Sequence, residues 1–172
     1  MKKSIIRFLS AALSLLLLTL PLASCGDKNS SSYRNDVTVG AVCDAAEGCV
    51  PTADGYYNYA DDSEYLDFNF EGANSLIESY EIRIARASDN INQFGVFKVK
   101  DGSANVMKTI CQTYIDIMME RWVSQANYIF DEHPKMENAE VRVFGNYVVY
   151  TMLLPSDKTA VFNAIDALLK QK

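Results

Sequence analysis

The chain has 172 residues, of which 16 are Lys or Arg and 22 are Asp or Glu, so its formal net charge is −6. Nucleic acids and anionic lipid surfaces attract basic faces, so this acidic balance argues against both as electrostatic partners. The length suits a single domain with a hydrophobic core of its own.

The beginning of the chain has the pattern of a secretory signal. Lys2, Lys3 and Arg7 precede an apolar run over residues 11–23. This run is shorter than the roughly 20 apolar residues of a membrane-spanning helix. We therefore expect an export signal at this end and not a membrane span.

The sequence Leu22-Ala23-Ser24-Cys25 closes this run and resembles the bacterial lipobox. In that motif the cysteine thiol takes a diacylglyceryl group, and signal peptidase II cuts just before it. We expect residues 1–24 to be a lipoprotein signal peptide and Cys25 to hold the protein in the cell membrane, facing the extracytoplasmic side. Two acyl chains on one thiol bind a bilayer stably. An ordinary signal peptide with a free cysteine, or an uncleaved membrane helix, are the alternatives.

After the signal, residues 25–36 are polar and rich in serine, which predicts a flexible tether behind the lipidated cysteine. Residues 37–172 are expected to form one globular domain. Removal of the three basic residues of the signal leaves 13 basic and 22 acidic side chains, a net charge of −9. Attachment to the membrane would therefore rest on the lipid alone.

Three further cysteines follow. Cys43 lies within a helix predicted over residues 38–48, and Cys49 lies just after it. Cys111 lies in a later helical pattern. Outside the cytoplasm, Cys43 and Cys49 either form a disulfide, with Gly48 ending the helix so that the chain folds back, or remain two free thiols. No second Cys/His pair has the spacing of a zinc site.

Residues 52–67 combine four tyrosines with five acidic residues. Tyrosine offers rigid amphipathic area, so this segment is either a contact surface or an irregular connection whose rings cover the edge of the core. The second interpretation is favoured. The four tyrosines are Tyr56, Tyr57, Tyr59 and Tyr65.

A calcium-loop pattern overlaps the end of this segment. Five residues fall on positions one, three, five, six and twelve of the EF-hand loop, namely Asp67, Asn69, Glu71, Gly72 and Glu78. Phe68 and Phe70 alternate as in a strand, and no helix clearly precedes Asp67. The context therefore argues against calcium, and we expect no metal ion or cofactor.

The remaining pattern predicts two β-hairpins with helices after each of them, because apolar spacing changes between period two and period 3.6. The expected elements are strands over residues 79–85 and 94–100, a long helix over 104–130, strands over 139–144 and 147–153 around a Gly145-Asn146 turn, and a helix over 158–170. The predicted fold class is α+β: two layers, with a largely antiparallel sheet of two hairpins packed by the long helix and the C-terminal helix on one face.

Two segments carry a resemblance to a known family. FGVFKVKD at residues 94–101 and NAEVRVFGNYVVY at residues 138–150 flank the long helix. They resemble the small lipoproteins of Gram-positive bacteria grouped as domain of unknown function 4358. The resemblance extends over about residues 79–169, most of the expected domain.

Gly145-Asn146-Tyr147 is the most specific part of the resemblance. The family's lipoprotein setting agrees with the lipobox, but the resemblance implies no activity, substrate or catalytic residue. A glutamate that the family has in the first hairpin is replaced here by Gln93.

No catalytic constellation stands out. His133, the single histidine, is expected as a surface cation at the C-terminal end of the long helix. The leading hypothesis is a non-enzymatic binding module whose partner is an envelope protein or a small ligand. One alternative is a carboxylate-based envelope hydrolase that uses Asp61 and Asp67. Another is a small-ligand sensor that uses residues 56–65.

Overall fold

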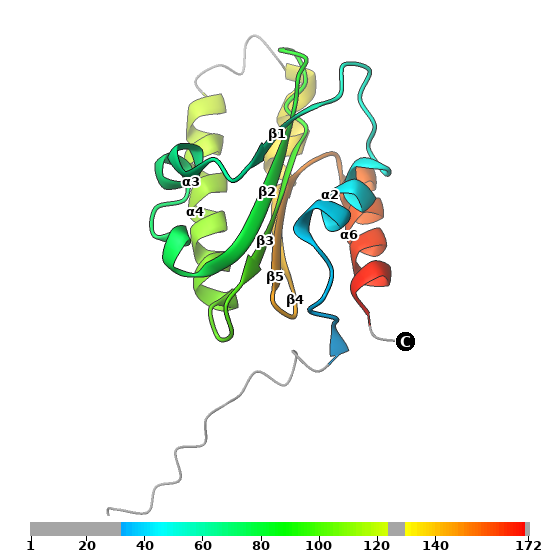
Figure 1. The fold of residues 1–172 in the computed structure, drawn as a ribbon. Coiled ribbons are helices and arrows are strands. Elements are labelled where there is room, and N and C mark those ends of the chain that lie inside the picture. The colour runs from blue at the N-terminus through cyan, green and yellow to red at the C-terminus, as the bar shows by residue number, and fades with distance from the viewer. Residues whose placement is uncertain (1–31, 124–129, 171–172) are drawn as a thin grey trace, which may run out of the picture.

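The computed structural model describes residues 32–123 and 130–170 (Figure 1). Its strands form one open sheet in the order β1-β2-β3-β5-β4, with every neighbouring pair antiparallel. This confirms the predicted α+β class. The strands are β1 (Tyr56–Ala60), β2 (Ile77–Ala85), β3 (Gln93–Val99), β4 (Glu140–Phe144) and β5 (Tyr147–Met152).

Helices cover both faces of this sheet (Figure 1). One face carries α2 (Val39–Glu47) and α6 (Pro155–Leu169), and the other carries α4 (Ala104–Val123) with the short α3 (Ser63–Asn69). The remaining short helices are η2 (Ala73–Ser75), η3 (Phe130–Glu132) and α5 (His133–Glu137).

The fold therefore has three layers, whereas the sequence predicted two. The physical reason lies in the central strands. All six residues of β5 are buried, and so are six of the seven residues of β3. A strand that is apolar on both faces needs cover on both faces, and period-two alternation does not describe it.

Each face has its own core. Toward α2 and α6, the sheet packs Phe94 and Val149 against Phe162. Toward α4, it packs Phe97 and Val148 in a core that also holds Met107 and Cys111 of α4. Met107, Cys111, Tyr114 and Ile115, which recur at three- and four-residue steps along α4, are all buried in this core.

Local sequence signals predict the positions of most of the other elements correctly. The helix predicted over residues 38–48 is α2, where the Thr38 Oγ1 accepts a hydrogen bond from the Ala41 N–H at 3.2 Å. Gly145 has φ +61°, as the predicted two-residue turn between β4 and β5 requires. The prediction that the long helix continues beyond Val123 concerns residues 124–129, which lie outside the described residues.

Residues 52–67 are predicted to be an irregular connection whose rings cover the edge of the core. The ring cover is confirmed for Tyr56, which is buried, and for Tyr59 and Tyr65, which pack against the core, but the irregularity is wrong. The segment contains the edge strand β1 and most of α3, joined at Asp61, whose φ of 59° makes the sharp turn. The Asp62 carboxylate then accepts a hydrogen bond from the Tyr65 N–H at 2.9 Å and caps α3. This cap outweighs the short strand-like alternation of Phe68 and Phe70.

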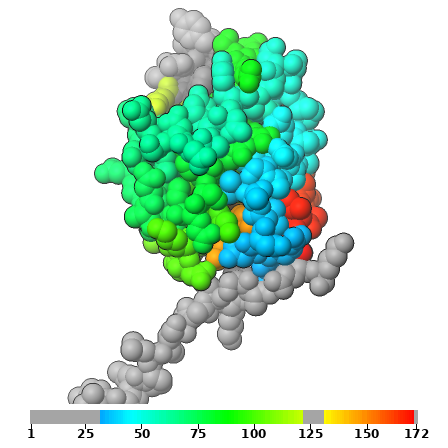
Figure 2. Space-filling model, in the orientation of Figure 1, coloured from blue at the N-terminus to red at the C-terminus, as the bar shows by residue number. Residues whose placement is uncertain are grey.

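The first described residues of the chain contact the C-terminal helix, α6. Arg34 N–H donates to the Leu169 carbonyl at 2.7 Å, and Tyr33 forms an isolated β-bridge with Lys170. In Figure 2 the earliest coloured residues and α6 accordingly lie close together at the same end of the molecule. The flexible tether predicted over residues 25–36 thus includes Tyr33 and Arg34, which the structure instead places on the domain.

Candidate functional site

A cleft of about 270 Å³ lies between α3, the C-terminal half of α4 and the turn that joins β2 to β3. Ile84, Met118 and Met152 supply apolar walls. The polar lining comes from side chains of several elements: Tyr65 and Asn69 on α3, Asn90 in the turn, Gln93 on β3, and Tyr114 and Arg121 on α4. Its volume is near the lower end of small-molecule pockets, which span roughly 300–1,000 Å³.

Gln93 is the central polar group of this cleft. It is only 3% exposed, and its Nε2 donates to the Tyr114 Oη at 2.7 Å and to the Tyr150 Oη at 2.5 Å. Both protons of one amide nitrogen are therefore committed to phenol oxygens. Tyr114 shares a further side-chain hydrogen bond with Tyr65. The result is a chain of hydrogen bonds from α3 through α4 to the centre of the sheet.

Gly95 makes room for this arrangement. It lies opposite Tyr150 in the β3–β5 pair and opposite Ile82 in the β2–β3 pair. A Cβ on Gly95 would lie 2.3 Å from the Tyr150 Cε1 and 2.9 Å from the Ile82 Cγ1. The absent side chain thus allows the Tyr150 ring to lie against the β3 backbone and to reach Gln93 two residues away.

Burial keeps these phenols neutral. Desolvation raises the pKa of Tyr114 and Tyr65, and it raises the pKa of the fully buried Tyr150 well above its ordinary value. The hydrogen bonds from Gln93 act in the opposite direction on Tyr114 and Tyr150 but are smaller causes. At neutral pH the hydroxyls can therefore give and accept hydrogen bonds, but they do not supply a phenolate base or nucleophile.

An ion pair fixes the turn at the edge of the cleft. Lys135 Nζ donates to the Glu132 Oε2 at 2.6 Å and to the Asn90 Oδ1 at 3.1 Å. The same Glu132 oxygen accepts the Ile91 N–H at 2.8 Å. Lys135 is itself buried, so η3 and α5 hold the β2–β3 turn, and with it Asn90, in a defined position.

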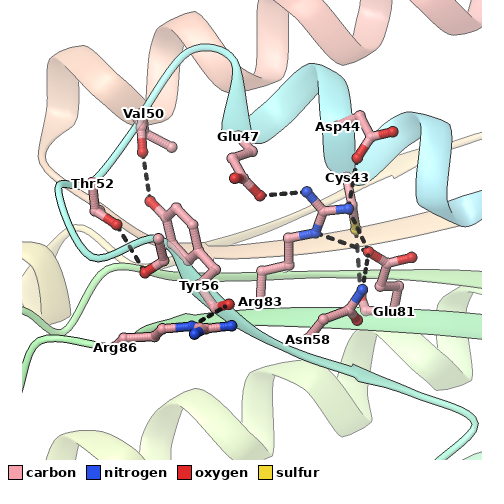
Figure 3. A network of polar contacts seen from close by, with 11 residues as sticks. Cys43, Asp44, Glu47, Val50, Thr52, Tyr56, Asn58, Glu81, Arg83 and Arg86 are labelled. Carbon is pink, nitrogen blue, oxygen red and sulfur yellow. Dashed lines mark hydrogen bonds and ion pairs between the residues drawn. The ribbon is translucent and has the colours of Figure 1, made fainter.

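A second polar cluster lies on the opposite face, between α2 and the sheet (Figure 3). Arg83 on β2 pairs with the carboxylates of Asp44 at 2.7 Å, Glu81 at 2.6 Å and Glu47. Asn58 of β1 donates to Glu81 at 3.0 Å. Each of these five side chains has a partner within the cluster, so we assign the cluster the structural role of attaching α2 to β1 and β2.

The cysteine predictions have different outcomes. Cys25 and the lipobox residues Leu22, Ala23 and Ser24 lie outside the described residues. Cys43 and Cys49 are free thiols that the structure does not bring together. The Cys43 thiol faces the Glu81 carbonyl at 3.6 Å, whereas the Cys49 thiol bonds back to the Ala45 carbonyl at 3.4 Å.

The calcium-like pattern does not form a ligand loop in the structure. Asp67 and Asn69 lie in α3, and the Asp67 carboxylate accepts a hydrogen bond from Asn74. Glu78 pairs with Lys98 at 3.0 Å. Within residues 32–123 and 130–170, no group of three or more His, Cys, Asp or Glu side chains is arranged to hold a metal ion.

His133 begins α5, so its predicted position at the C-terminal end of a helix is wrong. Its Nδ1 lies 3.4 Å from the Glu137 carboxylate one turn later. Of the two acids in the hydrolase alternative, neither Asp61 nor Asp67 lines the cleft.

Sequence reasoning assigned no role to the central groups of the cleft. The sequence pattern places Tyr114 in a predicted helix and Tyr150 in a predicted strand, without a role for either hydroxyl. One signal was present: a tyrosine at a core position needs a partner for its hydroxyl. That signal indicates that a buried polar group exists, but it does not identify Gln93.

Residues 54–153 match the family profile of the domain of unknown function DUF4358, which is more than half of the chain. The chain belongs to the DUF4358 family. The DUF4358 match includes the whole sheet, α3, α4 and every residue that lines the cleft, and it leaves out α2 and α6. No curated protein and no solved structure shows a significant match to the chain.

Proposed function

We propose that this DUF4358 protein is a lipid-anchored extracytoplasmic binding module without enzymatic activity, and that its cleft binds a small organic ligand. The observation that carries the proposal is the buried Gln93 amide, which fixes two phenol hydroxyls beside a partly apolar cleft. Such a combination of apolar walls and a few fixed polar groups is typical of small-molecule sites.

The lining also favours a class of ligand. The chain as a whole is acidic, yet none of the described residues that line the cleft is Asp or Glu, and Arg121 contributes a cation. Amide and phenol groups offer hydrogen bonds to neutral polar atoms. We therefore expect a ligand with an apolar body and a neutral or anionic polar group.

A binding role agrees better with these groups than catalysis does. The tyrosines are held neutral by burial, and Asp61 and Asp67 lie away from the cleft. General acid–base work requires a group that titrates near the working pH and reaches the substrate. These observations support the binding module over the carboxylate-based hydrolase.

The anchor is supported by the pattern of residues 1–25 alone. No helix within the described residues is long and apolar enough to cross a membrane. We expect the wild-type chain to be isolated with the membrane and to carry lipid on Cys25. Cys25→Ser should abolish lipidation and leave either released protein or an uncleaved precursor. A Cys25→Ser chain that is still processed and bound to the membrane would contradict the anchor.

Ligand binding is tested by thermal unfolding with a panel of amino acids, monosaccharides and short carboxylic acids. A ligand at a hundredfold excess over its Kd stabilises the folded state by about 2.7 kcal/mol. For a domain of this size that corresponds to a rise in Tm of roughly 8 °C. Saturable stabilisation by a compound of the expected class supports the proposal, and the absence of any such compound in the panel opposes it.

Two neighbouring substitutions locate the site. Met118→Trp places a large ring in the cleft, whereas Ile117→Trp puts the same ring at a position that is 41% exposed on the same helix. The ligand-dependent rise in Tm should disappear in Met118→Trp and persist in Ile117→Trp. Equal stabilisation of both variants would show that the ligand binds elsewhere.

A further inference from the structure

The first described residues are attached to the rest of the domain through Tyr33. The Tyr33 hydroxyl donates to the Asp166 Oδ1 at 2.9 Å, and its ring packs edge-on against Phe144 with centroids 5.8 Å apart. The backbone bond from Arg34 to Leu169 adds a second point of attachment. Tyr33 therefore fixes where the chain enters the domain.

The turn between β4 and β5 is shaped to receive this ring. A Cβ on Gly145 would lie 3.0 Å from the Tyr33 Cβ, so the glycine permits close contact as well as the positive φ. At the same end, Val99 N–H donates to the Asn146 carbonyl at 2.8 Å, and Asn146 donates to Asp101 at 2.6 Å. We call this end, formed by Tyr33, the β4–β5 turn and the β3–α4 turn, the docking end.

The cleft lies at the other end of the sheet. Strand β3 begins at Gln93 in the cleft and finishes at Val99 beside the β4–β5 turn. Six residue steps of about 3.3 Å separate the two ends by roughly 20 Å. Figure 1 shows the same arrangement, with the β2–β3 turn and α5 at one end of the sheet and both the chain entry and the end of α6 at the opposite end.

The sequence places Cys25 eight residues before Tyr33. Eight residues span at most about 28 Å even when fully extended. Two basic side chains near the docking end are paired with carboxylates, Lys170 with Asp166 at 2.6 Å and Lys98 with Glu78 at 3.0 Å. The short tether and its fixed entry point, and not a basic surface, would therefore set the position of the domain on a membrane.

We propose that the docking end faces the bilayer and that the cleft lies on the membrane-distal side, so that its ligand comes from the aqueous phase. This inference rests on the proposed lipidation of Cys25. It makes Tyr33 a positioning residue for the whole domain, because without its contacts residues 33–36 would join the tether.

The orientation can be measured by energy transfer to the bilayer. Lipidated protein is reconstituted into phosphatidylcholine vesicles that contain a headgroup-labelled acceptor lipid, and a fluorescent amino acid is placed at Asn105 or at Asp89. Asn105 is exposed near the docking end, and Asp89 is exposed in the β2–β3 turn beside the cleft. With the two positions about 20 Å apart along the sheet, transfer should be at least about twofold more efficient from position 105.

Two substitutions test the part played by Tyr33. Tyr33→Ser should bring the two transfer efficiencies closer together, because the entry point is released. Tyr57→Ser, at a tyrosine that is 50% exposed on β1, should leave the contrast unchanged. Melting curves check that both variants fold, and the comparison of the two reporters in the wild-type chain decides the orientation without any variant.

The outcomes separate the two proposals. A wild-type chain that carries no lipid on Cys25 overturns the proposed function, and with it the basis for the orientation. A lipidated chain with equal transfer from both positions, or with greater transfer from position 89, overturns the orientation and leaves the binding module standing. An unchanged contrast in Tyr33→Ser overturns the role of Tyr33.

Discussion

A missing side chain organises a buried polar cluster of this protein. Gly95 leaves space for the Tyr150 ring, and the Tyr150 hydroxyl then meets the Gln93 amide that also serves Tyr114. Each of these groups would be costly to bury alone, since an unsatisfied polar group loses about 1–3 kcal/mol. Together they satisfy one another, and the cleft gains a fixed polar wall.

Gly95→Ala should therefore destabilise the protein strongly. The added methyl group overlaps Tyr150 and Ile82, so either the ring or the strand must move, which costs about 3 kcal/mol in a packed core. Urea denaturation measures the loss. Gly48→Ala is the matched control: Gly48 has φ −58°, and alanine there should be neutral or stabilise by up to about 1 kcal/mol. A Gly95→Ala chain as stable as the wild type would contradict this account of Tyr150.

Among the elements, α2 is held on the sheet by ion pairs as well as by apolar packing. Its Asp44 and Glu47 reach Arg83 on β2, and Arg83 also neutralises Glu81, which is only 6% exposed (Figure 3). Burial lowers the pKa of Arg83. Its hydrogen bonds to the three carboxylates together raise the pKa by more than burial lowers it, so the net shift is upward. The guanidinium stays charged at any pH at which the protein folds.

Arg83→Met should lower the free energy of unfolding by about 3 kcal/mol, because it leaves the Glu81 carboxylate buried without its cation. Chemical denaturation at neutral pH measures the change. Arg34→Met removes the exposed pair with Asp36 and should cost less than about 1 kcal/mol. Adding Glu81→Met to Arg83→Met should restore part of the loss. Similar effects of Arg83→Met and Arg34→Met would show that the cluster does not hold α2.

The elements with strong local signals were predictable from the sequence. Both hairpins, α2, α4 as far as Val123, and α6 have clear periodicity, caps or turn residues. The three-layer arrangement was missed because β3 and β5 are apolar on both faces. The segment with β1 and α3 was missed because its signals are short, and β1 is stabilised by pairing with β2.

The cleft was beyond prediction for a different reason. Gln93 meets Tyr114 and Tyr150, which are 21 and 57 residues away along the chain. These contacts depend on the β3–β5 register and on how α4 crosses the sheet, and neither is encoded in a local pattern. The acidic composition argues against a basic surface, and in the structure Lys98, Arg83 and Lys135 each pair with a carboxylate.

At the scale of the whole molecule, the burial of tyrosine hydroxyls and cysteine thiols makes the folded state less stable at alkaline pH. Desolvation raises the pKa of Tyr114 and Tyr150 above 10.0, and it raises the pKa of the Cys43 and Cys111 thiols above 9.0. Above these ordinary values the unfolded chain loses protons that the folded chain keeps. A raised pKa of an acid therefore gives stability that is complete at lower pH and declines as pH rises.

Stability should accordingly be nearly constant from pH 7 to about pH 8.5 and then fall steeply toward pH 11. A tyrosine that stays protonated in the folded state costs about 1.4 kcal/mol at pH 11 relative to neutral pH. A buried thiol, whose ordinary pKa is lower, costs more, so the four groups together approach the whole stability of a typical domain. Urea midpoints across this range measure the decline.

Cys111→Ala should reduce the slope of stability against pH, because burial is the cause of the raised pKa of that thiol and alanine has no proton to lose. Stability that is unchanged at pH 11 would mean that these side chains reach water in the folded protein.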